Sequence, residues 1–360
     1  MFDPRTRNRR DLFTHGVENL LNKAANALDL TNPLAFLGLD RSYTRLTRTA
    51  MFTDMQVLYG AYESVTRQKT GMEILDEIDR FDAMLNIWRS ETELSQLNQT
   101  AHRAPVPVSP ELFAMIKLAW RYYHRTQGAF DITTTPLVRL WGFFERNPRV
   151  PSLEAIRETR KRVGMHLVEL DEEMKTVYFK TEGVEMTPAS MGKGVALDYA
   201  MRVAHQQGLT DVLLNGGFSS VLASGAPAWK DHWQFDIRNP LDHTRPLAAL
   251  KLRDQGFSTS GSELQSFEHE GRTYGHIIDP RTGWPARTML NVSVLAPTAA
   301  EAEVLSTSFY VMGVEKTLEY CENHKNIGVI ILSLPDAKGK HEIITANINR
   351  DTLEVLNKSC

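Results

Sequence analysis

The stretch "GRTYGHIIDPRTGWPARTML", residues 271–290, contains more turn signals than one hairpin needs. Asp-Pro, Thr-Gly and Trp-Pro follow one another within it, and each pair favours a turn or loop. A single histidine, His276, stands just before them, between a tyrosine-glycine pair and two isoleucines. The pattern predicts either a plain hairpin with a polar ring, or a rigid loop that presents a titratable group.

Length and composition exclude several classes of protein. The chain has 360 residues, a formal net charge of -3 and a hydrophobic fraction of 42%, which are ordinary values for a folded domain with a real core. The charge gives no reason to expect nucleic acid as a partner. Two isolated cysteines indicate neither a disulfide framework nor a zinc site. No apolar run approaches the roughly 20 residues of a membrane-spanning helix.

The N-terminus resembles an export signal only in part. "NRRDLFTHG", residues 8–16, looks like the start of a twin-arginine signal, but an amphipathic helix pattern follows in place of an apolar segment. This favours a cytoplasmic protein and leaves a periplasmic or exported one open. We expect a partly helical N-terminal extension over 1–47, one domain over 48–350 and a C-terminal tail over 351–360.

The periodicity of the remaining sequence predicts an α+β fold. A strand is expected near residues 48–65 and a helix over 71–91, with Trp88 near its end. Another helix is expected after the cap Ser109 and the first-turn residue Pro110, ending at Gly128. Strands and helices then mix without the regular alternation of a parallel α/β protein.

Several short motifs could contribute chemistry. In "SMGKG", Lys193 lies between two glycines at a predicted helix N-terminus, which favours an anion, although a solvated lysine explains it equally well. Glu303 and Thr307 are four residues apart on one helix and could bind Mg²⁺, or form an ordinary surface pair. Asp131 could bond a heterocycle or form an Asx turn, and Trp88 could stack on a flat ring or pack in the core.

The order of the segments is more informative than any one of them. "IWRSETELSQLN", "GAFDITTTPLVRLWGF", "SMGKGVALD", "LLNGG", "STSGSE", "YGHIIDPRTGWP" and "AEAEVLSTS" follow in this order. Over about residues 48–340 the sequence resembles the FAD:protein FMN transferases, the ApbE-type flavin transferases. The resemblance implies a T-fold-related α+β core with a smaller subdomain, and an FAD site between them.

The resemblance also implies roles for individual residues. His276 is the candidate general acid or base. Mg²⁺ would be bound by the backbone carbonyl of Ser190 and the side chains of Glu303 and Thr307. The positions that match FAD contacts in the family are Met51, Trp88, Ala129, Phe130, Asp131, Thr187, Lys193 and Ile277.

As a member of this family, the protein would move FMN from FAD to a Thr or Ser hydroxyl of a target flavoprotein. The product would be a phosphoester, and AMP would leave in a Mg²⁺-dependent reaction. The acceptor would have a D-x-x-[ST]-A-T-like motif, and membrane association would come only through that acceptor.

The chain departs from the family pattern at several positions. Phe52 replaces a glycine, Thr187 and Glu303 each replace an aspartate, and Phe218 replaces an asparagine. These departures leave two alternatives open, which are a non-catalytic flavin-binding carrier or assembly factor, and an FAD pyrophosphatase.

Overall fold

A computed structural model describes residues 43–60, 65–217, 219–227, 230–262, 265–349 and 351–356. The twin-arginine-like start, the predicted leader helix and Phe218 lie outside these residues. The first described strand, β1 (Tyr43–Ala50), crosses the boundary predicted between residues 47 and 48. At the other end, β18 (Leu353–Val355) pairs with β9 (Pro246–Leu252), so part of the predicted tail is a strand of a sheet.

The described helices and strands confirm a mixed α+β architecture. The helices are α3 (Val65–Leu85), α4 (Glu93–Thr100), α5 (Pro110–Arg125), α6 (Thr135–Leu140), α7 (Leu153–Arg160), α8 (Gly192–Gln206), α9 (Ala299–Met312) and α10 (Val314–Asn323), with a short 3-10 turn at Met165–Leu167. The large sheet has the order β1-β2-β6-β7-β10-β15-β16-β17, and all its neighbouring strands are antiparallel. Its strands after β1 are β2 (Thr53–Gly60), β6 (Val212–Gly216), β7 (Ser220–Ser224), β10 (Gln255–Gly261), β15 (Asn291–Ala296), β16 (Gly328–Leu332) and β17 (Ile343–Ala346).

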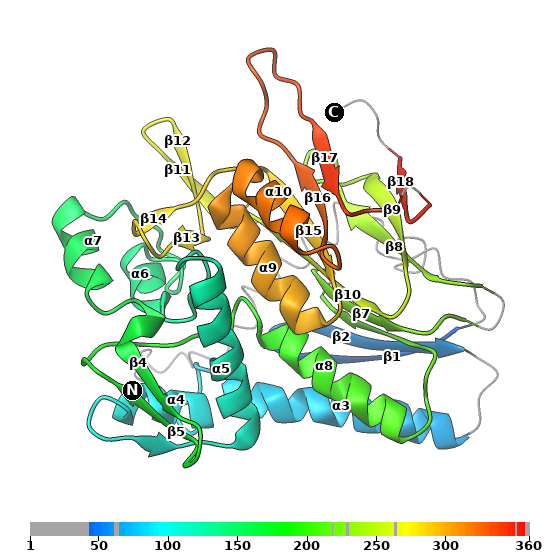
Figure 1. Ribbon diagram of the computed structural model, residues 1–360, viewed down its shortest axis with the longest axis horizontal. Helices are drawn as coiled ribbons and strands as arrows, with labels where there is room; N and C mark the ends of the chain where they lie inside the picture. Colours follow the sequence, from blue (N-terminus) through cyan, green and yellow to red (C-terminus); the bar gives the residue numbers. More distant parts are fainter. Residues whose placement is uncertain are drawn as a thin grey trace, which may run out of the picture.

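Strand β2 shows why this sheet is covered on both faces. Met55, Val57 and Tyr59 are fully buried and belong to the hydrophobic cluster with α3 and α8. Leu58, between them, belongs to the cluster formed with β8 (Trp233–Arg238) and β9. Because successive side chains of a strand point to opposite faces, an apolar layer is needed on each side. Figure 1 shows α3, α8 and α9 on one face and the sheet of β8, β9 and β18 on the other.

A smaller subdomain contains α4 to α7 and the sheet of β3 (Val106–Pro107), β4 (Val168–Asp171) and β5 (Thr176–Phe179). It lies beside the large sheet in Figure 1. The predicted start of α5 is confirmed, since Ser109 Oγ accepts a hydrogen bond from the Leu112 amide, 3.3 Å away, and Pro110 is in the first turn. Gly128, at φ +76°, follows the end of the helix, as expected.

Two local predictions were wrong. The single strand expected near residues 48–65 is a hairpin, in which Ala50 pairs with Thr53 across a turn made by Met51 and Phe52. Neither central residue of this turn is Gly, Asn or Asp, the residue types that signal such a turn. The helix expected to reach Trp88 ends at Leu85, so Trp88 lies in the following turns and is 45% exposed.

The segment after Asp131 contains the short helix α6. From Gly271 to Leu290 the chain forms β12 (Arg272–Gly275), β13 (Ile278–Asp279) and β14 (Trp284–Pro285), and β11 (Ser266–His269) pairs with β12. Within the described residues, no helix is both long and apolar enough to cross a membrane.

Candidate functional site

The first turns of α8 and α9 meet around a buried carboxylate, Glu303, which is 4% exposed. Lys193 Nζ lies 3.0 Å from its Oε1, and the Gly194 amide donates to its Oε2 over 2.7 Å. The Ser220 hydroxyl, at the start of β7, donates to Oε1 as well. A buried carboxylate is stable only if it is paired and hydrogen-bonded, and these donors meet both conditions.

The two helices approach closely because residue 194 is glycine. A Cβ atom there would lie 2.5 Å from the carbonyl oxygen of Ala299. Asp198 then accepts hydrogen bonds from the amides of Ala299 at 2.8 Å and Ala300 at 3.0 Å, at the N-terminus of α9. Burial and, to a lesser extent, the charge of Glu303 raise the pKa of Asp198 to about 7, although the hydrogen bonds from the two amides lower it. Below that pH, Asp198 gains a proton.

A row of hydroxyl groups continues from this carboxylate along α9 and β10. Ser260 Oγ lies 2.9 Å from Ser306 Oγ and 3.3 Å from Thr307 Oγ1. Ser306 also donates to Ser258 over 3.2 Å. The sequence predicted Thr307 at this place, but the serines around it were not anticipated.

The carboxylate, hydroxyl and carbonyl oxygens at this junction are ligand types that a hard cation prefers. Glu303 and Thr307 lie one helical turn apart, and Ser190 is in the turn that leads into α8. The Lys193 ammonium already pairs with Glu303, so a cation would have to share this carboxylate or replace the lysine. In the described part of the chain, no three His, Cys, Asp or Glu side chains form a metal-binding group. A site here would therefore depend on these mixed oxygen donors.

His276 follows β12 and is half-buried. Its Nδ1 lies 3.3 Å from the carbonyl oxygen of Gln265, and its own amide donates to the same oxygen over 3.0 Å. Because a carbonyl can only accept, Nδ1 carries the proton in this bond and Nε2 keeps a lone pair. Burial lowers the pKa of His276, so the ring is neutral near pH 7. The arrangement leaves Nε2 able to accept a proton.

The loop after His276 is fixed by its own hydrogen bonds. Asp279 Oδ1 accepts from the Arg281 amide at 2.9 Å, and both carboxylate oxygens bind the Arg281 guanidinium. The Gly283 amide donates a 2.8 Å hydrogen bond to the Asp279 carbonyl oxygen. Trp141, fully buried, donates from Nε1 to the Gly283 carbonyl over 2.9 Å. The many turn residues therefore hold one defined loop beside the histidine.

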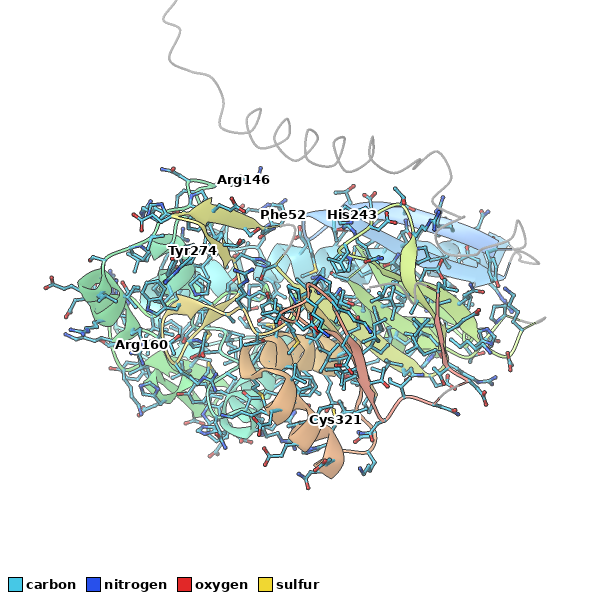
Figure 2. All side chains as sticks on the ribbon, turned by 90° about the horizontal axis from the view of Figure 1, so that it is seen from above. Phe52, Arg146, Arg160, His243, Tyr274 and Cys321 are labelled. Carbon is cyan, nitrogen blue, oxygen red and sulfur yellow. The ribbon has the colours of Figure 1, made fainter. Side chains whose placement is uncertain are left out.

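Aromatic side chains support the segment from residue 265 to 286, which we call the aromatic arm. The Trp141 ring lies 5.4 Å from Tyr274 and 5.2 Å from Trp284, measured between centroids. Phe143 lies edge-on to His276 at 6.5 Å. Figure 2 shows Tyr274 and Arg160 in the same part of the molecule. Packing therefore positions His276, whose only described hydrogen bonds go to Gln265.

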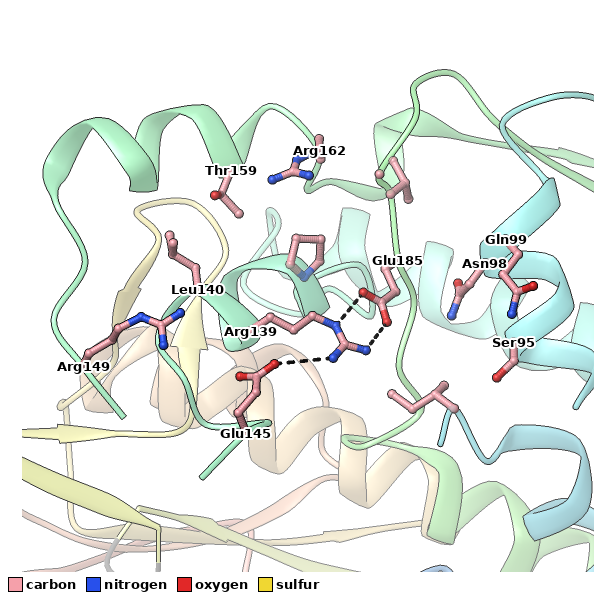
Figure 3. A pocket seen from close by; sticks show the side chains of 14 residues that line it. Ser95, Asn98, Gln99, Arg139, Leu140, Glu145, Arg149, Thr159, Arg162 and Glu185 are labelled. Carbon is pink, nitrogen blue, oxygen red and sulfur yellow. Dashed lines mark hydrogen bonds and ion pairs between the residues drawn. The ribbon is translucent and has the colours of Figure 1, made fainter. Parts of the chain in front are cut away.

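Trp88 lies at one end of a chain of contacts in the smaller subdomain. Its ring is 5.1 Å from Phe144, and the Arg139 guanidinium lies 4.5 Å above the same phenylalanine. Arg139 also forms two hydrogen bonds with Glu185, of 2.7 and 2.9 Å. Ile87, the neighbour of Trp88, lines a groove of about 640 Å³ with Arg139 and Glu185, which Figure 3 shows. Trp88 is thus an exposed ring and not a core residue.

The segment Ala129–Phe130–Asp131 is largely buried. Ala129 and Phe130 are 2% and 1% exposed and pack in the main core, so their side chains offer little surface to a ligand. Asp131 accepts 2.7 and 2.6 Å hydrogen bonds from the amide and hydroxyl of Thr133, which confirms the Asx-turn interpretation. Its Oδ2 is buried without a well-formed hydrogen bond among the described residues, and burial raises the pKa of Asp131 to about 6.

The structure brings some of the remaining candidates together. The Thr187 amide donates to the Ile132 carbonyl over 2.9 Å, next to Asp131. Met51 Cε would lie 3.3 Å from a Cβ on Gly192, beside Lys193. Ile277 packs against the main core. No described hydrogen bond joins His276 to the other candidates.

Two functional-looking residues were missed by the sequence interpretation. The Ser220 hydroxyl donates to Glu303, and the sequence feature that could have indicated Ser220 is its position shortly after "LLNGG". Asp198 of α8 accepts a hydrogen bond at the start of α9. The sequence feature that could have indicated it is that Asp198 is a lone acid on the apolar helix that follows "SMGKG". Both depend on partners about 80 to 100 residues away in the chain.

The antiparallel sheet, the smaller subdomain and the α8–α9 junction define a flavin-transferase fold. The chain superposes on the flavin transferase ApbE from Vibrio cholerae with a TM-score of 0.74 and 25% identity, covering 84% of this chain and 97% of that one. The family model described as the ApbE family matches residues 51–331. The chain belongs to the ApbE family.

Named relatives agree with this assignment. The FAD:protein FMN transferase of Klebsiella pneumoniae is 30% identical over 246 residues, covering 67% of this chain and 70% of the relative. That of Haemophilus influenzae is 30% identical over 281 residues, covering 76% and 81%. The family predicted from the order of motifs is confirmed, and with it the prediction of an enzyme.

Proposed function

We propose that this protein transfers FMN from FAD to a threonine or serine hydroxyl of an acceptor flavoprotein and releases AMP. Membership of the ApbE family and relatives named FAD:protein FMN transferase support the reaction class. The observation that carries the chemistry is His276, a neutral imidazole whose Nε2 is free to accept a proton.

The transfer needs one bond to form and one to break at the same phosphorus. The acceptor hydroxyl oxygen attacks the phosphorus of the FMN half of FAD, and the bond from that phosphorus to the bridging pyrophosphate oxygen breaks. The hydroxyl proton passes to Nε2 of His276, and AMP leaves with the bridging oxygen. A neutral histidine is suited to this step because a general base must be unprotonated when the hydroxyl approaches.

The start of α8 is the part of the chain suited to the negative charge of the pyrophosphate. Helix N-termini favour anions, and this turn also contains the Lys193 ammonium, which is paired with Glu303. Glu303, Thr307 and the Ser190 carbonyl would hold Mg²⁺, which supplies positive charge that stabilises the pyrophosphate oxygens. Asp131, Thr187 and Ile277 remain proposed FAD contacts, with Met51 and Trp88. Ala129 and Phe130 would act through their backbone.

The reaction is tested with FAD, Mg²⁺ and an acceptor carrying a D-x-x-[ST]-A-T-like motif. We expect the acceptor to gain the mass of one FMN phosphoester, measured by intact mass spectrometry, together with an equal amount of AMP. An acceptor with Ala in place of the motif hydroxyl is the matched control. Omitting Mg²⁺ should remove both products.

The alternatives give different products. Free FMN and AMP without labelled acceptor would identify an FAD pyrophosphatase. Tight binding of FAD without any AMP would identify a non-catalytic flavin-binding protein. Either result, obtained with several acceptors, would contradict the proposed transfer.

A further inference from the structure

The turn between β1 and β2 breaks the usual rule for its own conformation. Met51 and Phe52 have φ values of +50° and +63°, and the flanking residues Ala50 and Thr53 are paired. Such two-residue turns select Asn-Gly or similar pairs, because a side chain with a Cβ is disfavoured at positive φ. A large aromatic residue in this region is a genuine outlier.

The chain contains a second turn of the same kind that obeys the rule. In the hairpin of β11 and β12, Glu270 and Gly271 have φ values of +50° and +72° between the paired residues His269 and Arg272. There the second central position is glycine. The strain at Phe52 is therefore a property of its sequence and not of hairpins in this fold.

The surrounding structure holds the strained turn in place. The Met51 amide donates to Asp82 Oδ1 of α3 over 3.1 Å, and Thr49 bonds Asp54 across the hairpin over 3.0 Å. Arg48 joins the same hairpin to α3 through ion pairs with Asp76 and Asp79 of 2.5 and 2.6 Å. The turn is thus fixed from several sides, which is how strained backbone persists at functional sites.

The tip of this hairpin lies at the α8 N-terminus. The Met51 side chain lies over Gly192, next to Lys193, and Thr53 lies against Gly217 in the turn that precedes Ser220. Phe52 itself is 54% exposed. Figure 2 shows it at the edge of the folded body.

We propose that Phe52 is a binding residue whose ring packs on a planar ring system of FAD. Phe52 is held in a strained turn, is exposed, and is adjacent in sequence to Met51, which lies at the proposed pyrophosphate site, so an aromatic ligand there could cover its ring. Stacking of this kind favours offset or edge contacts and is directional. The inference rests on the proposed use of FAD and adds a contact specific to this chain.

The test separates fold strain from ligand contact. Phe52→Gly should raise Tm by about 2 °C, because glycine accepts positive φ. The same variant should weaken FAD binding about tenfold, measured by flavin fluorescence and calorimetry, since base stacking on an aromatic ring contributes about this much. Phe52→Leu should also lose affinity, whereas Phe52→Tyr should keep it.

Separate titrations with FMN and with AMP identify the ring involved. A loss of affinity for FMN alone assigns the contact to the flavin, and a loss for AMP alone assigns it to adenine. Unchanged affinity of Phe52→Gly for all three ligands, or full affinity of Phe52→Leu, would overturn the inference while wild-type transfer of FMN stands. A wild-type protein that binds no FAD would overturn the proposed function together with it.

Discussion

The α8–α9 junction and the aromatic arm are built in opposite ways. At the junction, the charged group Glu303 is buried and receives hydrogen bonds or an ion pair from Lys193, Gly194 and Ser220. In the arm, His276 is half-buried and has hydrogen bonds only to Gln265, while aromatic packing fixes its surroundings. A satisfied group gives a rigid binding surface, and a group with a free lone pair can take part in proton transfer.

The largest effect is expected from His276→Ala in the arm. Loss of a general base lowers the rate by about 10²- to 10⁴-fold, so kcat/KM for FMN transfer should fall by about this factor. FAD affinity and Tm should stay close to wild type, because the side chain has few internal partners. Transfer at an unchanged rate would remove His276 from the chemistry.

At the junction, Gly194→Ala should mainly affect stability. The new Cβ would collide with the Ala299 backbone, which is rigid in α9, and we expect a loss of about 3 kcal/mol or more. Urea denaturation measures the change. Gly208→Ala is the control, because its Cβ meets nothing within 4 Å and only the positive φ of +77° opposes it. Equal losses in both variants would show that the close packing of α8 and α9 matters little.

Glu303→Ala should cost about 2–3 kcal/mol of the free energy of unfolding. It leaves the Gly194 amide, the Ser220 hydroxyl and the mostly buried Lys193 without their acceptor. Glu303→Asp tests the length of the side chain, because a shorter carboxylate cannot reach all three donors in the same geometry. If Glu303→Asp keeps stability and raises Mg²⁺-dependent transfer, the longer glutamate is a handicap to the reaction.

The pH dependence of kcat/KM should follow the neutral form of His276. Burial lowers the pKa of this ring from its usual value of about 6.5, so the base stays unprotonated to a lower pH than a free histidine. The rate should stay level as the pH falls through 6.5, then drop up to tenfold per unit below the lowered pKa. An acid limb starting well above pH 6.5 would contradict the assignment.

The smallest of these effects is expected from Trp141→Phe, which tests whether packing alone holds the arm. It removes the donor to the Gly283 carbonyl and leaves a small void, at a cost of about 1–2 kcal/mol. Because the loop would loosen, kcat should fall more than FAD affinity. Trp284→Phe is the matched control, since its indole N–H has no described hydrogen bond and it is partly exposed. A larger loss from Trp284→Phe would contradict this account.

The sequence determined those features whose causes are local. The cap at Ser109 and the stop at Gly128 follow from backbone and side-chain preferences within a few residues, and both are present. The order of motifs identified the family for a similar reason, since each segment is a short pattern readable without its partners. The hairpin at Met51 and Phe52 was missed because nothing local favours it.

Only the tertiary structure decided which charges meet. The sequence predicted Glu303 as a metal ligand or as part of a surface pair, yet it is buried, and an ammonium and an amide from α8, more than 100 residues earlier, already bind it. Trp88 was left between stacking and core packing, and the end of α3 at Leu85 places it on the surface. Partners that are distant in the chain and close in space set burial and electrostatics, and a local pattern has no information on either.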